Sequence, residues 1–303
     1  MVAELGLIDS LVGRSFECDY PPEVTQVESL VEPVIDQTLE THREIDQQIN
    51  RAMEENGTIY RVDQRRLRSL NPDILITQDL CEVCAPSERE LSQVIQTMNS
   101  PPEIVSMSPG SLSEIINNMR ELADVTDTVD QFHRWNESVQ EEFRRLKATR
   151  EPGDTPGVVA VEWYDPLYVA GHWVPEQITL AGGHPLLSKP KQPSHVIEPE
   201  ELLSADPDYL ILMPCGMSAN EALSGLDEFL SFQGFKQLSA VQNERVFTVD
   251  AGAYFARPGP RVVEGIQLLV HILRDEDSFT ARFDDAYVNV YDSRELSESK
   301  NGL

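Results

Sequence analysis

The sequence lacks the long apolar run of a membrane protein and the cysteines of a disulfide-stapled one. A transmembrane helix needs about 20 consecutive apolar residues, and no stretch of the chain comes near this length. The start, residues 1–7, has neither the basic residues nor the cleavage site of a signal peptide. Four cysteines in 303 residues are too few for a disulfide framework. A chain of this length and composition is expected to form two globular domains, each with its own core.

Basic residues are scarce too. Lys and Arg total 24, of which five are Lys, against 52 Asp and Glu, so the formal net charge is -28. Such a surface repels nucleic acid and anionic membranes, which excludes these partners. The acidic residues are spread along the chain, and this favours a halophilic-type surface, hydrated in a salt-rich cytoplasm, over a dedicated cation-binding function.

An internal repeat organises the sequence. Residues 66–77 and 201–212 each contain the end of a helix, a Pro-Asp turn and a continuous apolar strand. The flanking strands also recur in pairs, residues 60–63 with 195–198 and residues 103–106 with 245–248. Strands that alternate with helices and are apolar throughout are typical of a mostly parallel sheet covered on both faces. The repeat therefore predicts an α/β protein with two similar lobes.

One long helix is predicted between the lobes. Its apolar face follows a 4-3-4-3-4-3 spacing through Val125, Val129, Phe132, Asn136, Val139, Phe143 and Leu146. A helix of this length spans roughly 35–40 Å, and it ends before the Pro- and Gly-rich residues 151–157. The predicted domains are an N-terminal α/β lobe (1–107), a connecting helical segment (108–150), a C-terminal α/β lobe (151–292) and a frayed tail (293–303).

The beginning of the chain reads as a helix rather than a strand. Val2, Leu5, Ile8 and Leu11 recur at helical spacing. The N-terminal lobe is therefore expected to start without its first strand. A shortened gene start and a genuine feature of the protein are both open explanations.

The loops that follow the strands are the expected place for ligand chemistry, because ligands of parallel α/β sheets bind beyond the carboxyl ends of the strands. Five aromatic residues fall in or near such loops, namely Trp163, Tyr164, Trp173, Tyr254 and Phe255. Next to Gly and Pro they suggest the wall of a pocket for a flat ligand. The alternative is that they plug the edge of the lobe. Trp135, on the connecting helix, is expected to serve packing.

All four cysteines lie in the same loops. Cys18, Cys81 and Cys84 belong to the first lobe and Cys215 to the second. A thiolate metal site with His172 as a further ligand is one interpretation. A single C-x-x-C is weak support for it, and small thiols that line or underlie a pocket are the alternative.

Several motifs together resemble a known family. They are residues 70–84, residues 13–15 with 18–21, residues 170–176 and residues 257–261. Over nearly the whole chain the sequence resembles the cobalamin-binding branch of the periplasmic (solute-) binding proteins of ABC importers for cobalamin and iron chelates. The resemblance implies two Rossmann-like lobes with parallel sheets joined by one backbone helix. It also implies a monomer without a cofactor, which captures cobalamin or a related corrinoid as a transported ligand in the cleft between the two lobes. Outside the cytoplasm or at the cell surface, it would deliver this ligand to an ABC import permease. The absent signal peptide departs from the family and leaves a cytoplasmic location open.

The resemblance also implies roles for individual residues. The aromatic loops would contact the corrin, and arginines would meet its polar edges. The expected ligand-binding residues are Trp163, Tyr164, His172, Trp173, Tyr254, Phe255, Arg257, Arg261, Glu82, Asp19, Tyr20 and Gly216. One carboxylate on each lobe would dock on the permease, with Glu88 and Glu221 as candidates by position. The alternative is that Ser87-x-x-Glu90 and Ser218-x-x-Glu221 are helix capping boxes.

Two other functions stay open at this point. An iron-chelate or haem receptor on the same fold would use His172 or Tyr254 as an axial ligand. A cytoplasmic corrinoid- or metal-handling protein would use the cysteine loops. An enzyme is not expected, because the sequence has no Gly-rich phosphate loop, no Ser-His-Asp order and no zincin motif.

Overall fold

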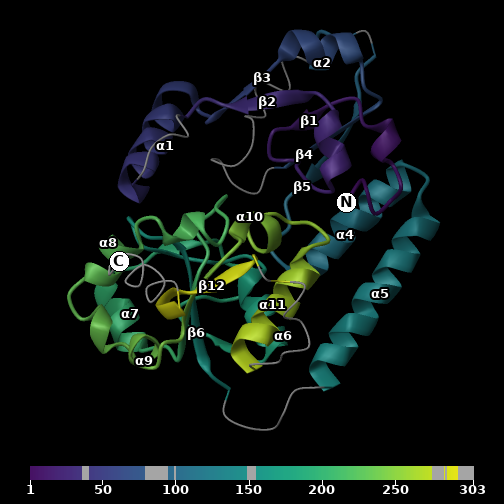
Figure 1. The fold of residues 1–303 in the computed structure, drawn as a ribbon. Helices are drawn as coiled ribbons and strands as arrows, with labels where there is room; N and C mark the ends of the chain where they lie inside the picture. The colour runs from purple at the N-terminus through teal and green to yellow at the C-terminus, as the bar shows by residue number, and fades with distance from the viewer. Residues whose placement is uncertain are drawn as a thin grey trace, which may run out of the picture. The chain divides into compact units, whose positions relative to one another are not determined.

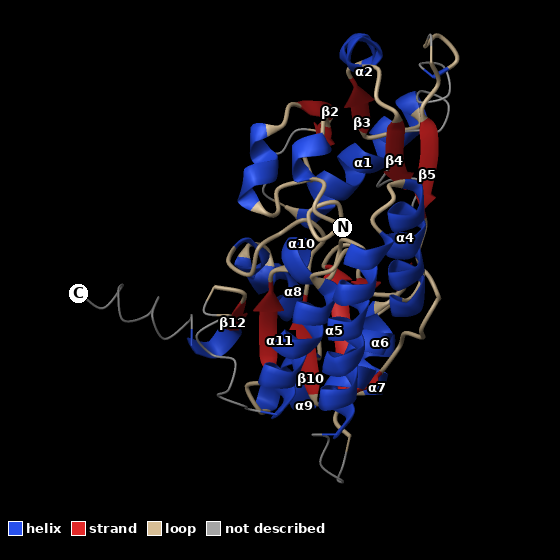
Figure 2. Cartoon of the chain, turned by 90° about the vertical axis from the view of Figure 1, so that its right-hand side faces the viewer, coloured by secondary structure: helices blue, strands red, loops and turns tan. Residues whose placement is uncertain are grey.

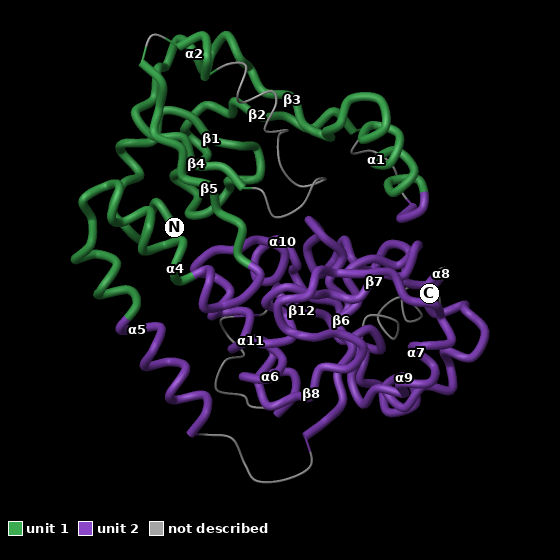
Figure 3. Tube along the Cα trace, turned by 180° about the vertical axis from the view of Figure 1, so that it is seen from behind, with its two compact units in different colours: residues 1–39, 44–109, 116–136 green, residues 40–43, 110–115, 137–303 purple. Residues whose placement is uncertain are grey.

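The computed structural model describes residues 1–35, 41–78, 95–98, 100–148, 155–274, 283 and 285–292. The chain divides into two compact units, which Figure 3 colours green and purple. The N-terminal unit comprises residues 1–39, 44–109 and 116–136. The C-terminal unit comprises residues 40–43, 110–115 and 137–303. Among the described residues, no helix has the length and apolar content needed to cross a bilayer.

The N-terminal unit contains two small sheets (Figure 1). In the first, β1 (Arg14–Ser15) runs parallel to β2 (Ser29–Pro33), which is antiparallel to β3 (Tyr60–Val62). In the second, β4 (Ile74–Gln78) is parallel to β5 (Glu103–Met107). The described helices of this unit are α1 (His42–Asn56) from its third residue onward, α2 (Gln64–Leu70), most of α4 (Leu112–Val125) and the first residues of α5 (Val129–Ala148).

The C-terminal unit is built on one larger sheet with the strand order β12-β11-β10-β6-β7-β9. Its central strands β6 (Gly157–Trp163), β10 (Tyr209–Leu212) and β11 (Val246–Val249) are parallel. The flanking strands are β7 (Tyr168–Val169), β9 (His195–Val196) and β12 (Tyr287–Asn289), and the short β8 (His184–Pro185) also pairs with β6.

Helices cover both faces of this sheet, as Figure 2 shows. Val159 and Val161 of β6 join a core cluster with α7 (Pro199–Ala205), α8 (Leu226–Ser231) and α9 (Ser239–Gln242). Val158 faces the other way, toward α6 (Val174–Ala181) and α11 (Val262–Arg274), which pack on one another. Because both faces are buried, the central strands are mostly apolar, as the sequence predicted, with Glu162 near the end of β6 and Thr248 in β11 as polar exceptions.

The helices of the two repeats, α2 and α7, begin and end at corresponding positions with similar caps. Asp63 caps the start of α2 by accepting a hydrogen bond from the backbone N–H of Arg66 (2.8 Å), and Glu198 caps α7 in the same relative position. The two helices end alike, at Asn71 (φ 46°) and Asp206 (φ 38°) in the left-handed conformation. Each is followed by a parallel strand. The predicted fold class, α/β with parallel sheets in two lobes, is confirmed.

The helical segment between the repeats differs from the single helix that the spacing predicted. Val125 ends α4, and α5 begins only at Val129. Between them Asp127 has a φ of 53°, a left-handed conformation that breaks a helix. From Val129 onward the predicted helix is correct, with Phe132 and Leu146 buried along it. The long helix therefore starts one turn later than expected.

The predicted helix at the start of the chain does not form. Gly6 (φ 75°) ends a single turn in which its N–H bonds to the carbonyl of Ala3 (2.9 Å), and only a 3-10 helix, η1 (Ile8–Ser10), follows. Glycine adopts this left-handed conformation without steric cost, so it stops the turn after one cycle. Leu5 is nevertheless buried, so its place in the apolar pattern reflects burial of the side chain and not a helix.

Candidate functional site

The loops at the carboxyl ends of β6, β10 and β11 meet in the C-terminal unit. The backbone N–H of Cys215, after β10, donates to the carbonyl of Glu162 in β6 (3.2 Å). The N–H of Ala251, after β11, donates to the carbonyl of Met217 (3.0 Å). Because the three strands are adjacent and parallel, their loops share one edge of the sheet. We call these three segments, residues 162–167, 213–218 and 250–261, the carboxyl-end loops.

Most of the aromatic residues that were predicted to form the wall of a ligand pocket lie in the hydrophobic core instead. Tyr164, Trp173 and Phe255 are each 2% exposed. The hydroxyl of Tyr164 donates to the carbonyl of Ala222 (2.7 Å), and Trp173 Nε1 donates to the carbonyl of Phe255 (2.9 Å). Burial raises the pKa of the Tyr164 hydroxyl. Because their polar tips are used inside the unit, these three side chains pack the ends of the strands, which corrects the expectation that they face a ligand.

Tyr254 and Arg261 are also occupied within the C-terminal unit. The guanidinium of Arg261 lies 4.6 Å from the centroid of the Tyr254 ring, a cation–π contact, and its Nε lies 3.7 Å from the carboxylate of Glu264. The other neighbour of the Tyr254 ring is Phe283, edge-on at 5.9 Å. Tyr254 is buried, so its expected contact with a ligand is corrected in the same way.

Trp163 is the predicted aromatic residue that stays half-buried. Its Nε1 donates to the backbone carbonyl of His42 (3.2 Å), and its ring lies 4.2 Å from the His42 ring. Next to them Arg43 forms an ion pair with Asp165 (2.6 Å). His42 was not among the predicted site residues, because nothing in the local pattern links a residue at the start of α1 to a loop more than a hundred positions later.

His42 is an unusual histidine. It is 2% exposed, and neither ring nitrogen has a hydrogen-bond partner among the described residues. Burial lowers its pKa from 6.5 to about 4, and the charge of Asp165 opposes this only in part. The imidazole is therefore neutral at neutral pH, held between aromatic rings.

His172 lies on a tightly built segment beside the end of β6. Its N–H donates to the carbonyl of Gln192 (2.6 Å), and the preceding Gly171 N–H donates to Ser194 Oγ (3.0 Å). The hydroxyl of Ser194 in turn donates to the carboxylate of Glu162. His172 is half-buried with a φ of 53°, and burial lowers its pKa. A neutral imidazole next to the carboxyl-end loops is able to coordinate a metal centre.

Gly216 and Arg257 both lie next to Gly252. A Cβ on Gly252 would lie 3.7 Å from Arg257 Nη2 and 3.8 Å from the carbonyl carbon of Gly216, so two carboxyl-end loops meet at this residue. Gly216 is exposed and Arg257 is half-buried. A guanidinium and exposed backbone thus lie near Gly252, and both are suited to a carboxylate or amide group on a ligand.

In the N-terminal unit the described candidates lie in the loop after β1. Asp19 and Tyr20 are both exposed, and Tyr20 retains 55% of its surface. Glu82 and Glu88 lie outside the described residues, so their expected roles in ligand binding and permease docking stay predictions.

The described residues offer no cluster of three or more His, Cys, Asp or Glu side chains that would hold a metal ion. Cys18 in the N-terminal unit and Cys215 in the C-terminal unit are exposed thiols. Cys81 and Cys84 lie outside the described residues. The thiolate site therefore stays a prediction.

Glu221 forms the contact that a capping box requires. Its carboxylate accepts hydrogen bonds from the backbone N–H (2.8 Å) and the hydroxyl (2.7 Å) of Ser218, and these bonds lower the pKa of Glu221. The carboxylate is also exposed, at the start of η3 (Glu221–Leu223). A capping role does not prevent permease docking, which stays a prediction.

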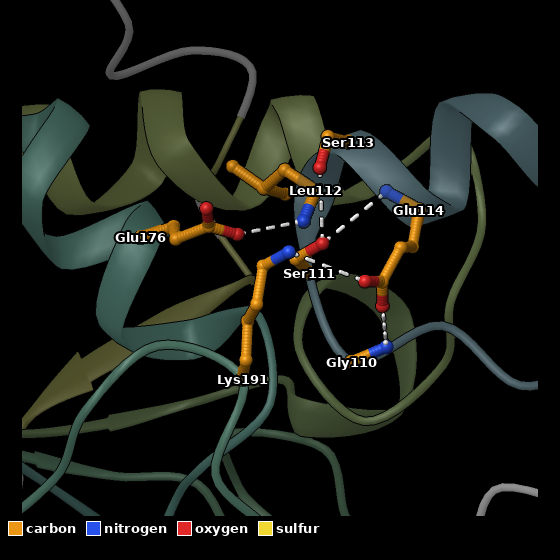
Figure 4. Close-up of polar contacts among 7 residues, drawn as sticks. All are labelled: Gly110, Ser111, Leu112, Ser113, Glu114, Glu176 and Lys191. Carbon is orange, nitrogen blue, oxygen red and sulfur yellow. Dashed lines mark hydrogen bonds and ion pairs between the residues drawn. The ribbon is translucent and has the colours of Figure 1, made fainter.

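The motif of residues 170–176 ends in a carboxylate with a clear structural task. Glu176 Oε2 accepts a hydrogen bond from the N–H of Leu112 at the start of α4 (2.7 Å), as Figure 4 shows. Glu114 bonds to the N–H of Gly110 (2.6 Å) and pairs with Lys191 (3.3 Å). The bond from Gly110 is the main cause of the lowered pKa of Glu114. The start of α4 is thus fixed to α6 and to the segment before β9.

Solved structures share this fold. An ABC transporter substrate-binding protein from Listeria monocytogenes aligns with a TM-score of 0.68 and 18% identity, over 91% of this chain and 94% of that one. The periplasmic vitamin B12 binding protein BtuF of Vibrio cholerae aligns at 0.61 and 20%, over 90% and 92%. The periplasmic heme-binding protein RhuT from Roseiflexus aligns at 0.65 and 21%, over 90% and 93%. At these identities the likeness shows the fold alone.

The family of the chain follows from its sequence. No curated protein matches the chain as a relative. The family profile described as "Periplasmic binding protein", however, matches residues 1–253. This family comprises substrate-binding proteins of ABC transporters. The match covers most of both units, including two of the carboxyl-end loops and the first residues of the third, and the chain therefore belongs to the periplasmic binding protein family.

Proposed function

We propose that this protein captures a corrinoid, in the first place cobalamin, and delivers it to an ABC import permease outside the cytoplasm. The observation that carries the proposal is the convergence of the carboxyl-end loops, with half-buried Trp163 on one segment and Gly216 and Arg257, both next to Gly252, on the other two. Support for the ligand class comes from the four motifs that resemble cobalamin-binding proteins, and the vitamin B12 binding protein of Vibrio cholerae has the same fold.

The proposed contact residues are those that the structure leaves accessible. In the C-terminal unit they are Trp163, His172, Gly216 and Arg257, which offer one aromatic face, one neutral imidazole, exposed backbone and one cation. A corrinoid has a large flat apolar ring edged with amide groups, and these four chemistries match it. In the N-terminal unit the proposed contact residues are Asp19 and Tyr20.

Haem or an iron chelate is the second candidate, favoured by a specific observation at His172. A haem receptor needs an axial His or Tyr. Tyr254 is buried against Arg261 and Phe283, so of the two ligands first considered only His172 remains accessible. Its lowered pKa keeps the imidazole neutral and able to bind iron at neutral pH.

Calorimetric titration of the purified protein in high-salt buffer tests the proposal. The ligands are cobalamin and cobinamide, with haem and a ferric siderophore for comparison. We expect saturable one-to-one binding of the corrinoids. A Soret shift on adding haem that is lost in His172→Ala, together with no corrinoid binding, would establish the second candidate instead. No binding of any of these ligands by folded protein would overturn both.

A further inference from the structure

The guanidinium of Arg14 lies inside the loop that follows β1. Its Nε donates to the carbonyl of Val27 (2.9 Å). Its Nη1 donates to the carbonyls of Ser15 (3.0 Å), Phe16 (3.3 Å) and Cys18 (3.3 Å). One side chain therefore satisfies backbone acceptors on both the loop after β1 and the segment before β2.

The first half of this loop has further anchors. Phe16 donates its N–H to the carbonyl of Val31 in β2 (3.2 Å), and its ring lies 5.8 Å from the ring of Tyr60. The N–H of Cys18 closes a turn onto the carbonyl of Ser15 (3.0 Å). After Cys18 the loop continues through Asp19 to Tyr20, which has more than half of its surface exposed.

The residue before Arg14 explains how the guanidinium comes so close. A Cβ on Gly13 would collide with the side chain of Leu30 in β2, so only glycine lets β1 approach β2 at this point. The backbone N–H of Arg14 then bonds to the carbonyl of Glu28 (3.0 Å), and its side chain turns back under the loop. Gly13 and Arg14 thus act as one structural unit.

Lysine would not replace arginine here. The carbonyls of Val27 and Ser15 are reached from two different nitrogens of one planar group. An ammonium is a single point on a flexible stem and lacks this fork. Hydrogen bonds from a cation are also stronger than neutral ones, so a half-buried guanidinium ringed by carbonyls fixes a loop firmly.

We propose that Arg14 is a positioning residue that holds residues 15–20 in the conformation in which Tyr20 meets the ligand. The inference rests on the proposed function, because it assigns the loop a ligand-facing task. An exposed aromatic ring at the end of an anchored loop loses little conformational entropy when a ligand covers it, which raises affinity. Arg14 itself acts through the loop.

The test combines affinity with a double-mutant cycle. In cobalamin titrations we expect Arg14→Met to weaken binding about tenfold or more, and Arg14→Lys to recover only a small part of the loss. Arg66→Met is the matched control, since Arg66 pairs with Glu28 (2.7 Å) in the same unit but does not touch the loop. If Arg14 works through Tyr20, the effects of Arg14→Met and Tyr20→Ala are far from additive. A general loss of stability would add to the Tyr20 effect instead.

Hydrogen exchange supplies a readout that needs no ligand. We expect faster exchange of the amides in residues 15–20 in Arg14→Met and unchanged exchange there in Arg66→Met. Normal corrinoid affinity of Arg14→Met, additive effects, or unchanged exchange would each overturn the inference and leave the proposed function intact. Failure of the proposed function has a different signature, because the wild-type protein and Arg66→Met would then also bind no corrinoid.

Discussion

The imidazole ring of His42 stacks on the phenol ring of Tyr164, with ring centroids 4.2 Å apart and an angle of 29° between the planes. Trp163 lies on it at the same centroid distance but tilted by 59°. A charged imidazolium in this position would have to be desolvated without a hydrogen-bond acceptor among the described residues. The packing therefore selects the neutral form.

This relationship predicts a stability that depends on pH. The unfolded chain takes up a proton on His42 near pH 6.5, whereas the folded chain does so only near pH 4. Between these values the unfolded state binds more protons, so stability falls as pH is lowered through this window. The loss attributable to His42 is on the order of 3 kcal/mol at full extent.

His42→Phe isolates this effect, because phenylalanine keeps an aromatic ring between Trp163 and Tyr164 but does not titrate. We expect the difference in unfolding free energy between wild type and variant to change steadily from pH 6.5 to about 4, measured by denaturant titration. Parallel curves for the two proteins would show that His42 is protonated normally in the folded state.

Substitutions of the two tryptophans of the C-terminal unit are predicted to affect different properties, ligand affinity at Trp163 and stability at Trp173. Trp163 is half-buried on a carboxyl-end loop, so Trp163→Ala is expected to weaken corrinoid binding about ten- to hundredfold. Trp173 is buried and donates to Phe255, so Trp173→Phe leaves a carbonyl unpaired and costs about 1–3 kcal/mol of stability.

Titration and thermal unfolding of both variants separate the two effects. Trp135→Ala is the control for binding, because Trp135 packs against the core of the N-terminal unit. Equal affinity of Trp163→Ala and wild type would remove Trp163 from the proposed contact surface. Unchanged stability of Trp173→Phe would mean that its indole N–H has no structural value.

The fold was predictable because its signals are local and repeated. Continuous apolar strands, the Pro-Asp turns at residues 72–73 and 207–208, and the spacing along α5 each depend on neighbours in the sequence. The errors came from single residues with positive φ. Gly6 stops a turn and Asp127 splits the connecting helix, and apolar spacing does not report either.

The site was harder to predict than the fold. Sequence position identified loops that meet at the carboxyl-end edge of the sheet, but not the direction of each side chain. Tyr164 and Trp173 were therefore expected at a ligand, and they lie in the core. Burial depends on what covers a residue from distant segments. The hydrogen bond between Tyr164 and Ala222, and the contact of His42 with Trp163, join parts of the chain that no local pattern connects.

Gly171 is predicted to tolerate no side chain. An added Cβ would lie 2.5 Å from both the carbonyl carbon of Pro193 and the backbone nitrogen of Ser194, and closer still to the carbonyl of Gln192. Backbone yields less easily than a side chain, so Gly171→Ala should cost about 1–3 kcal/mol and displace His172.

Gly259→Ala, on the carboxyl-end loop of residues 250–261, is the matched control, because a Cβ there meets nothing within 4 Å. Thermal unfolding and ligand titration of both variants make the comparison. Gly171→Ala with wild-type stability and affinity would mean that the segment around residues 192–194 moves freely away from Gly171.

The last prediction concerns Glu176, whose carboxylate serves two helix starts at once. It lies in the first turn of α6 and accepts the N–H of Leu112 at the first turn of α4. Both positions favour a negative charge. Glu176→Ala should therefore cost about 1–2 kcal/mol, as the loss of a helix cap does, and Glu176→Gln should cost less because the amide oxygen still accepts.

The control for Glu176 is Glu121→Ala on α4 itself, where an exposed carboxylate accepts only from the side chain of Asn118 (3.2 Å). It should change stability by no more than about 0.5 kcal/mol. Denaturant titration gives the free energies, and hydrogen exchange at the amides of residues 112–114 locates the effect. If Glu176→Ala matched Glu121→Ala in both measurements, α4 would begin equally well without the carboxylate. Glu176, at the end of the motif of residues 170–176, would then have a role other than anchoring the start of α4.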